Sequence, residues 1–169
     1  RYEGADANSV VGLEIKEKIN SSYISQQIKS MLSIQNENPT DAIGKAKELV
    51  ESVCKTILIC KGETIEKNIE FNPLVNKTIS VLKLMPKDIL DTHPVADNLK
   101  HILGQLKGIS AEIAPIRNAF GSGHGKDTSF KGLEARHARL LVGCSITLVD
   151  FLWSSYKVAE SDYPSDVLF

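Results

Sequence analysis

Apolar residues recur at alternating intervals of three and four residues along two long stretches of the chain, and this spacing constrains the fold most. The first stretch carries Ile43, Ala46, Val50, Val53, Ile57 and Cys60, and the second Leu99, Ile102, Leu106, Ile109, Ile113, Ile116 and Phe120. Residues at such intervals share one face of an α-helix. Alternation with a period of two is almost absent. The pattern therefore predicts an all-α fold in which both stretches turn an apolar face to the core.

Helix-starting and helix-breaking residues divide the chain into about five helices. The predicted helices cover about 10–34 (with an interruption near Asn20–Ser22), 39–61, 73–85, 99–120 and 133–157. Asn38 before Pro39 and Asn72 before Pro73 are typical of a capping residue followed by the first helical position. Helices of this length with short connections predict an antiparallel up-down core. Gly104 and Gly108, four residues apart, would let a neighbouring helix approach closely.

Length and charge limit the class of protein. The 169 residues suit a single domain, and 20 Lys+Arg against 21 Asp+Glu give a net charge of −1. A nearly neutral chain is not one that holds nucleic acid by bulk neutralisation of phosphates. Three cysteines without metal-type spacing favour a reducing cytoplasm over a disulfide framework. No apolar run of 18 residues occurs, so we expect no membrane span. The chain starts at Arg1 rather than Met, so we expect it to be part of a longer protein.

One polar stretch is not explained as the solvated face of a helix. It runs from Arg117-Asn118 at the end of the second apolar stretch, through a glycine-rich loop with Ser122 and His124, to Lys126. Such a loop brings backbone amides, an arginine, a histidine and a lysine together, which suits an anion. Histidine is also the side chain whose ordinary pKa lies nearest neutrality, so it is suited to proton transfer.

Two alternative interpretations of this loop fail. A phosphate-binding P-loop would need glycine where Phe120 stands and Ser or Thr where Asp127 stands. A zinc site would need several ligands at characteristic spacing, which the four histidines and three cysteines do not provide. We therefore expect neither a metal nor another cofactor. A metal-independent site acting on a phosphodiester needs only the residues present.

Three ordered blocks of the sequence resemble a known family. Asn38–Lys55, Arg117–Gly125 and Ala135–Leu152 are similar to the opening, the signature and the close of the abortive-infection C-terminal (Abi-C) domain, over about residues 36–156. That family belongs to the HEPN superfamily, whose mark is an arginine, four to six residues, and a histidine; here six residues separate Arg117 from His124. The resemblance implies a HEPN-like helical bundle over residues 36–158, with a helical extension (1–35) before it and a tail (159–169) after it.

The resemblance also implies a function. Many HEPN proteins are metal-independent endoribonucleases that act as toxins or antiviral effectors, and they commonly dimerise so that two motifs share one cleft. The catalytic candidates are then Arg117, Asn118 and His124, and the substrate-binding candidates Lys126, Ser122, Glu48 and Lys55. The expected partners are RNA, a second copy of the chain, and an antitoxin or an upstream sensor region. A non-catalytic module that binds RNA, nucleotide or a protein, and a purely structural dimerisation domain, remain open as alternatives.

Overall fold

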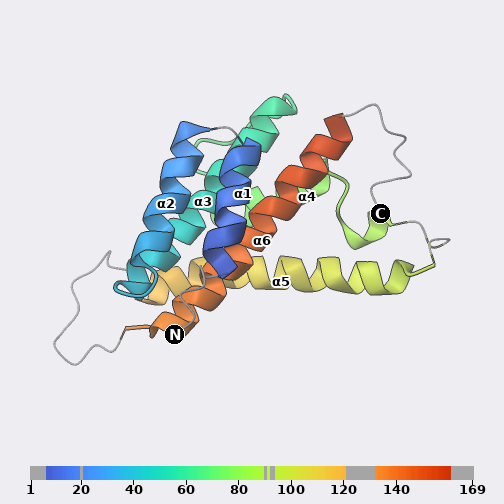
Figure 1. Ribbon diagram of the computed structural model, residues 1–169. Helices are drawn as coiled ribbons and strands as arrows, with labels where there is room; N and C mark the ends of the chain where they lie inside the picture. The colour runs from blue at the N-terminus through green and yellow to red at the C-terminus, as the bar shows by residue number, and fades with distance from the viewer. Residues whose placement is uncertain (1–6, 20, 90, 92–93, 121–131, 161–169) are drawn as a thin grey trace.

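The computed structural model describes residues 7–19, 21–89, 91, 94–120 and 132–160. Within these residues the chain forms helices and no strand, which confirms the all-α prediction. The elements are α1 (Ala7–Ile19), α2 (Ser22–Ile34), α3 (Pro39–Cys60), α4 (Phe71–Val81), the short 3₁₀ helix η1 (Pro86–Asp88), α5 (Ala96–Phe120) and α6 (Ala135–Glu160). Helices α1, α2 and α3 alternate in direction, whereas α5 crosses one end of the bundle (Figure 1).

The first apolar stretch forms the centre of the core. Helix α3 packs against α2, α4, α5 and α6. Its predicted inward residues are almost completely buried, with the exception of Cys60, which is exposed at the last turn. The Asn38 side chain accepts a hydrogen bond from the Asp41 backbone N–H at 3.3 Å, so the predicted start of this helix is confirmed.

The predicted interruption of the first helical region is also confirmed. Helix α1 ends at Ile19, and α2 begins at Ser22 with Ser21 as its capping residue. The Ser21 hydroxyl oxygen accepts a hydrogen bond from the Ile24 backbone N–H at 3.3 Å, which satisfies one of the free donors of the first turn. Both helices bury residues in the main core, among them Ile15, Ile28 and Met31.

The second apolar stretch was predicted to face the core along its whole length, and this is wrong for two of its residues. The side chains of Ile102 and Ile109 are 58% and 44% exposed. Because α5 crosses the end of the bundle, its buried side is made by Ala96, Leu103, Ser110 and Ile113, and of these Ile113 alone belongs to the predicted stretch. Gly104 and Gly108 also face open space, since a Cβ atom built on either would meet no other atom within 4 Å. The close approach predicted for these glycines is therefore absent among the described residues.

The prediction that Asn72 caps a helix is wrong as well. Helix α4 begins at Phe71, and the residue before it, Glu70, makes no side-chain capping bond. The Asn72 side chain is used elsewhere: its Nδ2 donates a hydrogen bond to the backbone carbonyl of Ala111 on α5, at 3.3 Å. The proline that follows still lies in the first turn, where its missing N–H costs nothing.

Helix α6 is long and apolar enough to cross a membrane by length and composition, although half of its most apolar window is buried in the fold. It packs along α3 and α1 and contributes Val142, Ile146, Val149 and Leu152 to the core. The core helix of a globular bundle has the same character, and α6 is such a helix here.

The central position of α3 gives a stability prediction. Replacing Leu49, which is fully buried in the middle of α3, by alanine leaves a cavity and should lower the free energy of unfolding by about 2–5 kcal/mol. Leu13→Ala on the exposed side of α1 is the matched control, with an expected change within about 0.5 kcal/mol. Urea denaturation followed by circular dichroism measures both. Equal losses for the two variants would contradict the central role of α3.

Candidate functional site

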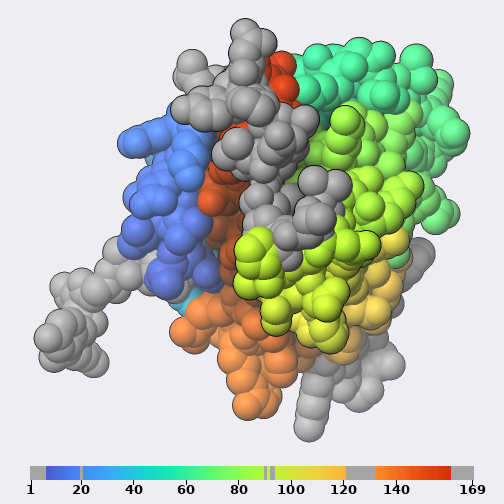
Figure 2. Space-filling view, turned by 90° about the vertical axis from the view of Figure 1, so that its right-hand side faces the viewer, coloured from blue at the N-terminus to red at the C-terminus, as the bar shows by residue number. Residues whose placement is uncertain are grey.

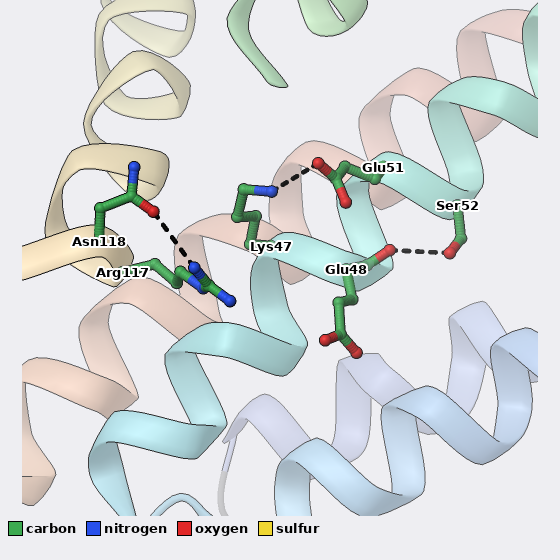
Figure 3. Close-up of polar contacts among 6 residues, drawn as sticks. All are labelled: Lys47, Glu48, Glu51, Ser52, Arg117 and Asn118. Atoms are coloured by element: carbon green, nitrogen blue, oxygen red, sulfur yellow. Dashed lines mark hydrogen bonds and ion pairs between the residues drawn. The ribbon is translucent and has the colours of Figure 1, made fainter. Parts of the chain in front are cut away.

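Arg117 and Asn118 lie in the last turn of α5, and both are exposed. The Arg117 Nη1 donates a hydrogen bond to the Asn118 Oδ1 at 3.3 Å (Figure 3). A cation in the last turn of a helix also interacts favourably with the helix dipole, because the free carbonyl groups there carry partial negative charge. The other predicted residues of this stretch, Ser122, His124 and Lys126, lie outside the described residues.

The Arg117 side chain points toward the stretch of α3 that carries Lys47 and Glu48 (Figure 3). Lys47 and Glu51, one turn apart on α3, form an ion pair at 2.6 Å, and their side chains are only 21% and 23% exposed. The Lys47 Nζ also lies 5.4 Å from the centroid of the Phe71 ring at the start of α4. The lysine is therefore held in place by a carboxylate and by an aromatic face.

The sequence analysis did not name Lys47 or Glu51 as site residues. The available signal was the spacing itself, because Glu51 follows Lys47 by one helical turn, beside the buried positions Ala46 and Val50. A charged pair at that place on a helix lies at the border of the core rather than on the fully solvated face. The position of the Lys47–Glu51 pair beside the end of α5 is seen only in the tertiary fold.

Of the two α3 residues predicted to bind substrate, Glu48 is exposed and lies on the stretch toward which Arg117 points. The Ser52 hydroxyl donates a hydrogen bond to the Glu48 backbone carbonyl at 2.8 Å. This bond does not involve the Glu48 carboxylate. Lys55 is also exposed, but it lies seven residues beyond Glu48, a separation of about 10 Å along the helix axis. Substrate that reaches both residues would have to extend along α3.

The charges of Lys47, Glu48, Glu51 and Arg117 sum to zero, but the two cations are not equally available to bind an anion. Lys47 is paired with Glu51, whereas no carboxylate among the described residues forms an ion pair with Arg117. The guanidinium has five N–H donors, and its one hydrogen bond to a described residue is the contact to Asn118. The described residues thus leave donors of Arg117 that suit two oxygen atoms of an anion such as a phosphodiester, in the bidentate geometry that arginine favours.

Neither Cys54 nor Cys144 adds an activated thiol to this site. Burial raises the pKa of the Cys54 thiol to about 12, so that this thiol is protonated at neutral pH. Burial also raises the pKa of Cys144, which lies on α6. Among the described residues no group of three or more His, Cys, Asp or Glu side chains is placed to hold a metal ion.

Comparison with known proteins identifies the class. The sequence model of the HEPN-like domain family Abi-C matches residues 21–156, which include the three blocks and both α3 and α5. The chain thus belongs to the HEPN-like Abi-C family, as the sequence blocks predicted. No curated protein and no solved structure gives a significant match. The family match begins at Ser21, before the boundary at residue 36, and α2 packs on α3 in the same core.

The pKa of Cys54 gives a prediction for thiol chemistry. A protonated, buried thiol does not react with an alkylating reagent, because the thiolate is the nucleophile. At pH 8 iodoacetamide should label the exposed Cys60 in the native protein, and Cys54 only after unfolding in urea. Peptide mass spectrometry of labelled samples measures this order. Labelling of Cys54 at the rate of Cys60 in the folded protein would contradict the burial of α3.

Proposed function

We propose that this protein is a metal-independent endoribonuclease of the HEPN type that acts as a toxin-like effector in antiviral defence. The observation that carries the proposal is the exposed Arg117 guanidinium, which has no ion-pair partner among the described residues and is separated from His124 by six residues in the sequence. Membership of the Abi-C family, whose name refers to abortive infection, supports the same role. The free cysteines are consistent with a cytoplasmic location.

The proposed reaction uses the nucleophile that RNA itself contains. The 2′-hydroxyl loses its proton to a base and attacks the adjacent phosphorus, and the bond from phosphorus to the 5′-oxygen breaks. The 5′-oxygen takes up a proton, so the products are a 2′,3′-cyclic phosphate and a 5′-hydroxyl. His124 serves in proton transfer, and Arg117 stabilises the negative charge that builds on the non-bridging oxygens. Asn118, which accepts a hydrogen bond from Arg117, orients the guanidinium.

The remaining candidates contact the RNA around the reacting phosphate. Lys126 and Ser122 would bind the phosphate or its neighbours, and Glu48 and Lys55 would contact the strand along α3. Helices α3 and α5 together carry five acidic and six basic side chains, so a grip on many phosphates is not expected. An antitoxin, or a sensor region upstream of Arg1, would then control when cleavage occurs.

Cleavage of a structured RNA in the presence of EDTA tests this function. The protein should cut RNA despite the chelator and leave 2′,3′-cyclic phosphate ends. His124→Ala should lower the rate about 10²–10⁴-fold, and Arg117→Ala about 10²-fold or more, because each removes a group that acts in the transition state. His101→Ala and Arg136→Ala, at exposed positions on α5 and α6, are the matched controls. RNA binding without cleavage, unaffected by these changes, would favour the non-catalytic module instead.

We further propose that the active form is a homodimer joined through the exposed apolar side of α5 and α6. Ile102 and Ile109 on α5 are joined there by Leu140 on α6, which is 65% exposed. Between the two helices lies a groove of about 370 Å³ whose lining includes Leu106, Ile109, Leu140 and Cys144. Figure 2 shows the first turns of α6 (orange) beside α5 (yellow and yellow-green).

A second copy of the chain is the proposed occupant of this surface, because its contact would bury the exposed side chains of Ile102 and Ile109. Gly104 and Gly108 lie about half a helical turn around α5 from Ile102, so they belong to a different side of this helix. Because Arg117 lies in the last turn of α5, an interface along α5 would bring two copies of this residue into one assembly.

Oligomeric state tests this interface. Ile109→Glu should convert the dimer to a monomer, because a charge would be buried in an apolar contact. Ile59→Glu, at another exposed isoleucine near the end of α3, is the matched control and should leave the dimer intact. Size-exclusion chromatography with light scattering measures the mass of each variant. A monomeric parent protein, or a dimer that survives Ile109→Glu, would contradict the proposal.

A further inference from the structure

A break in the hydrogen bonding of α5 lies just before Arg117. Pro115 is inside the helix, two residues from Arg117. In an α-helix the N–H of residue 115 would donate to the carbonyl of residue 111. Proline has no N–H, and its ring crowds that carbonyl. The Ala111 carbonyl therefore lacks its helical donor, yet α5 continues to Phe120.

A side chain from another helix supplies the missing donor. The Asn72 Nδ2, in the first turn of α4, donates to the Ala111 carbonyl oxygen at 3.3 Å. The two residues are 39 positions apart in the sequence. A partly buried carbonyl without a partner is costly, and this one is satisfied at the place where proline removes the ordinary donor.

The oxygen atom of the Asn72 amide indicates which property of asparagine is needed at this position. Its Oδ1 is buried and has no hydrogen-bond partner among the described residues. An amide with one buried unpaired oxygen is a poor way to fill space, since an apolar side chain of similar size would leave no polar atom unpaired. What asparagine supplies here, and an apolar residue could not, is the donor to Ala111.

The first turn of α4 also contacts the other side of the site. Phe71, the residue before Asn72, lies under the ammonium group of Lys47, which is paired with Glu51 on α3. Two adjacent residues of α4 thus contact the polar stretch of α3 and the broken turn of α5. A shift of the first turn of α4 would therefore disturb a contact with α3 and a contact with α5 at the same time.

We propose that Asn72 is a positioning residue, which fixes the proline-broken end of α5 and thereby the direction in which Arg117 faces the site. The helix after Pro115 has lost one of its own hydrogen bonds, so the bond from α4 replaces an internal constraint with one that depends on tertiary packing. The catalytic consequence rests on the proposed ribonuclease function, whereas the structural constraint does not.

A double-mutant cycle tests the structural part. Asn72→Ala should lower the melting temperature by about 2–6 °C, because the Ala111 carbonyl loses its donor. Pro115→Ala restores an N–H at position 115, so in that background Asn72→Ala should lower the melting temperature by less than half as much. Asn76→Ala, one turn further along α4, is the matched control and should show no such coupling. Equal effects of Asn72→Ala in both backgrounds would overturn the proposal.

Nuclear magnetic resonance reports directly on Arg117. Asn72→Ala should shift the Nε–Hε signal of Arg117 and the carbonyl ¹³C signal of Ala111, and Asn76→Ala should leave both in place. Should Pro115→Ala fail to fold, Asn72→Leu gives a second test, because it keeps a side chain of similar size and removes the NH₂ group without adding a charge. Asn72→Leu must then reproduce the shifts of Asn72→Ala. Unchanged signals in both variants would overturn the proposal.

Kinetics test the catalytic part. Misdirection of a group that acts in the transition state should lower kcat about 10- to 100-fold in Asn72→Ala while KM changes less than about twofold. A rise in KM with kcat unchanged would mean that Asn72 affects RNA binding rather than Arg117. If no variant of Arg117 or His124 alters RNA cleavage, the proposed function fails, but the cycle and the Arg117 signal still decide the role of Asn72.

Discussion

The burial of α3 is the constraint on which the rest of the structure depends. Its inward residues are almost completely excluded from water, and four other helices pack against it. Each fully buried aliphatic side chain contributes about 1.5–3 kcal/mol relative to exposure. The buried residues of the first apolar stretch, from Ile43 to Ile57, therefore supply much of the free energy that stabilises the fold. The polar residues Lys47 and Glu51 are placed by the same helix, at the border of its buried face. The part of the candidate site that lies on α3 is therefore carried by a helix at the centre of the core.

Much of the fold could be predicted from the sequence because its determinants are local. The alternation of apolar residues in α3, the Asn38–Pro39 start and the break at Ser21 each depend on a few adjacent residues, and all three predictions are confirmed. Helix α5 illustrates the limit. Its apolar spacing is as regular as that of α3, but it crosses the end of the bundle and leaves Ile102 and Ile109 exposed. Periodicity identifies an apolar face and does not identify what covers it.

The site was predictable to a smaller extent, for a related reason. The arginine and histidine spacing is a property of one short stretch, and so is the family resemblance that contains it. The roles of Lys47 and Asn72 are not local. Asn72 on α4 has the sequence context of a helix cap, but its partner is the Ala111 carbonyl on α5. That carbonyl lacks its usual helical donor because the residue four positions after it, Pro115, has no N–H. Such a contact requires the tertiary arrangement of α4 and α5.

The chain is nearly neutral overall, and two of its cations near the candidate site differ in whether a carboxylate neutralises them. Lys47 is partly buried, forms an ion pair with Glu51 and lies against the Phe71 ring, so its charge is largely neutralised within the protein. Arg117 is exposed, and no described carboxylate neutralises it. Among the described residues, Arg117 at this end of α5 is thus an exposed cation with donors beyond its bond to Asn118, and the stretch of α3 toward which it points carries Glu48 and the Lys47–Glu51 pair. The proposed function requires contact with the single phosphate whose bond is cleaved, and one bidentate guanidinium is suited to that contact. A protein that coats nucleic acid would instead need to neutralise many phosphates along the backbone.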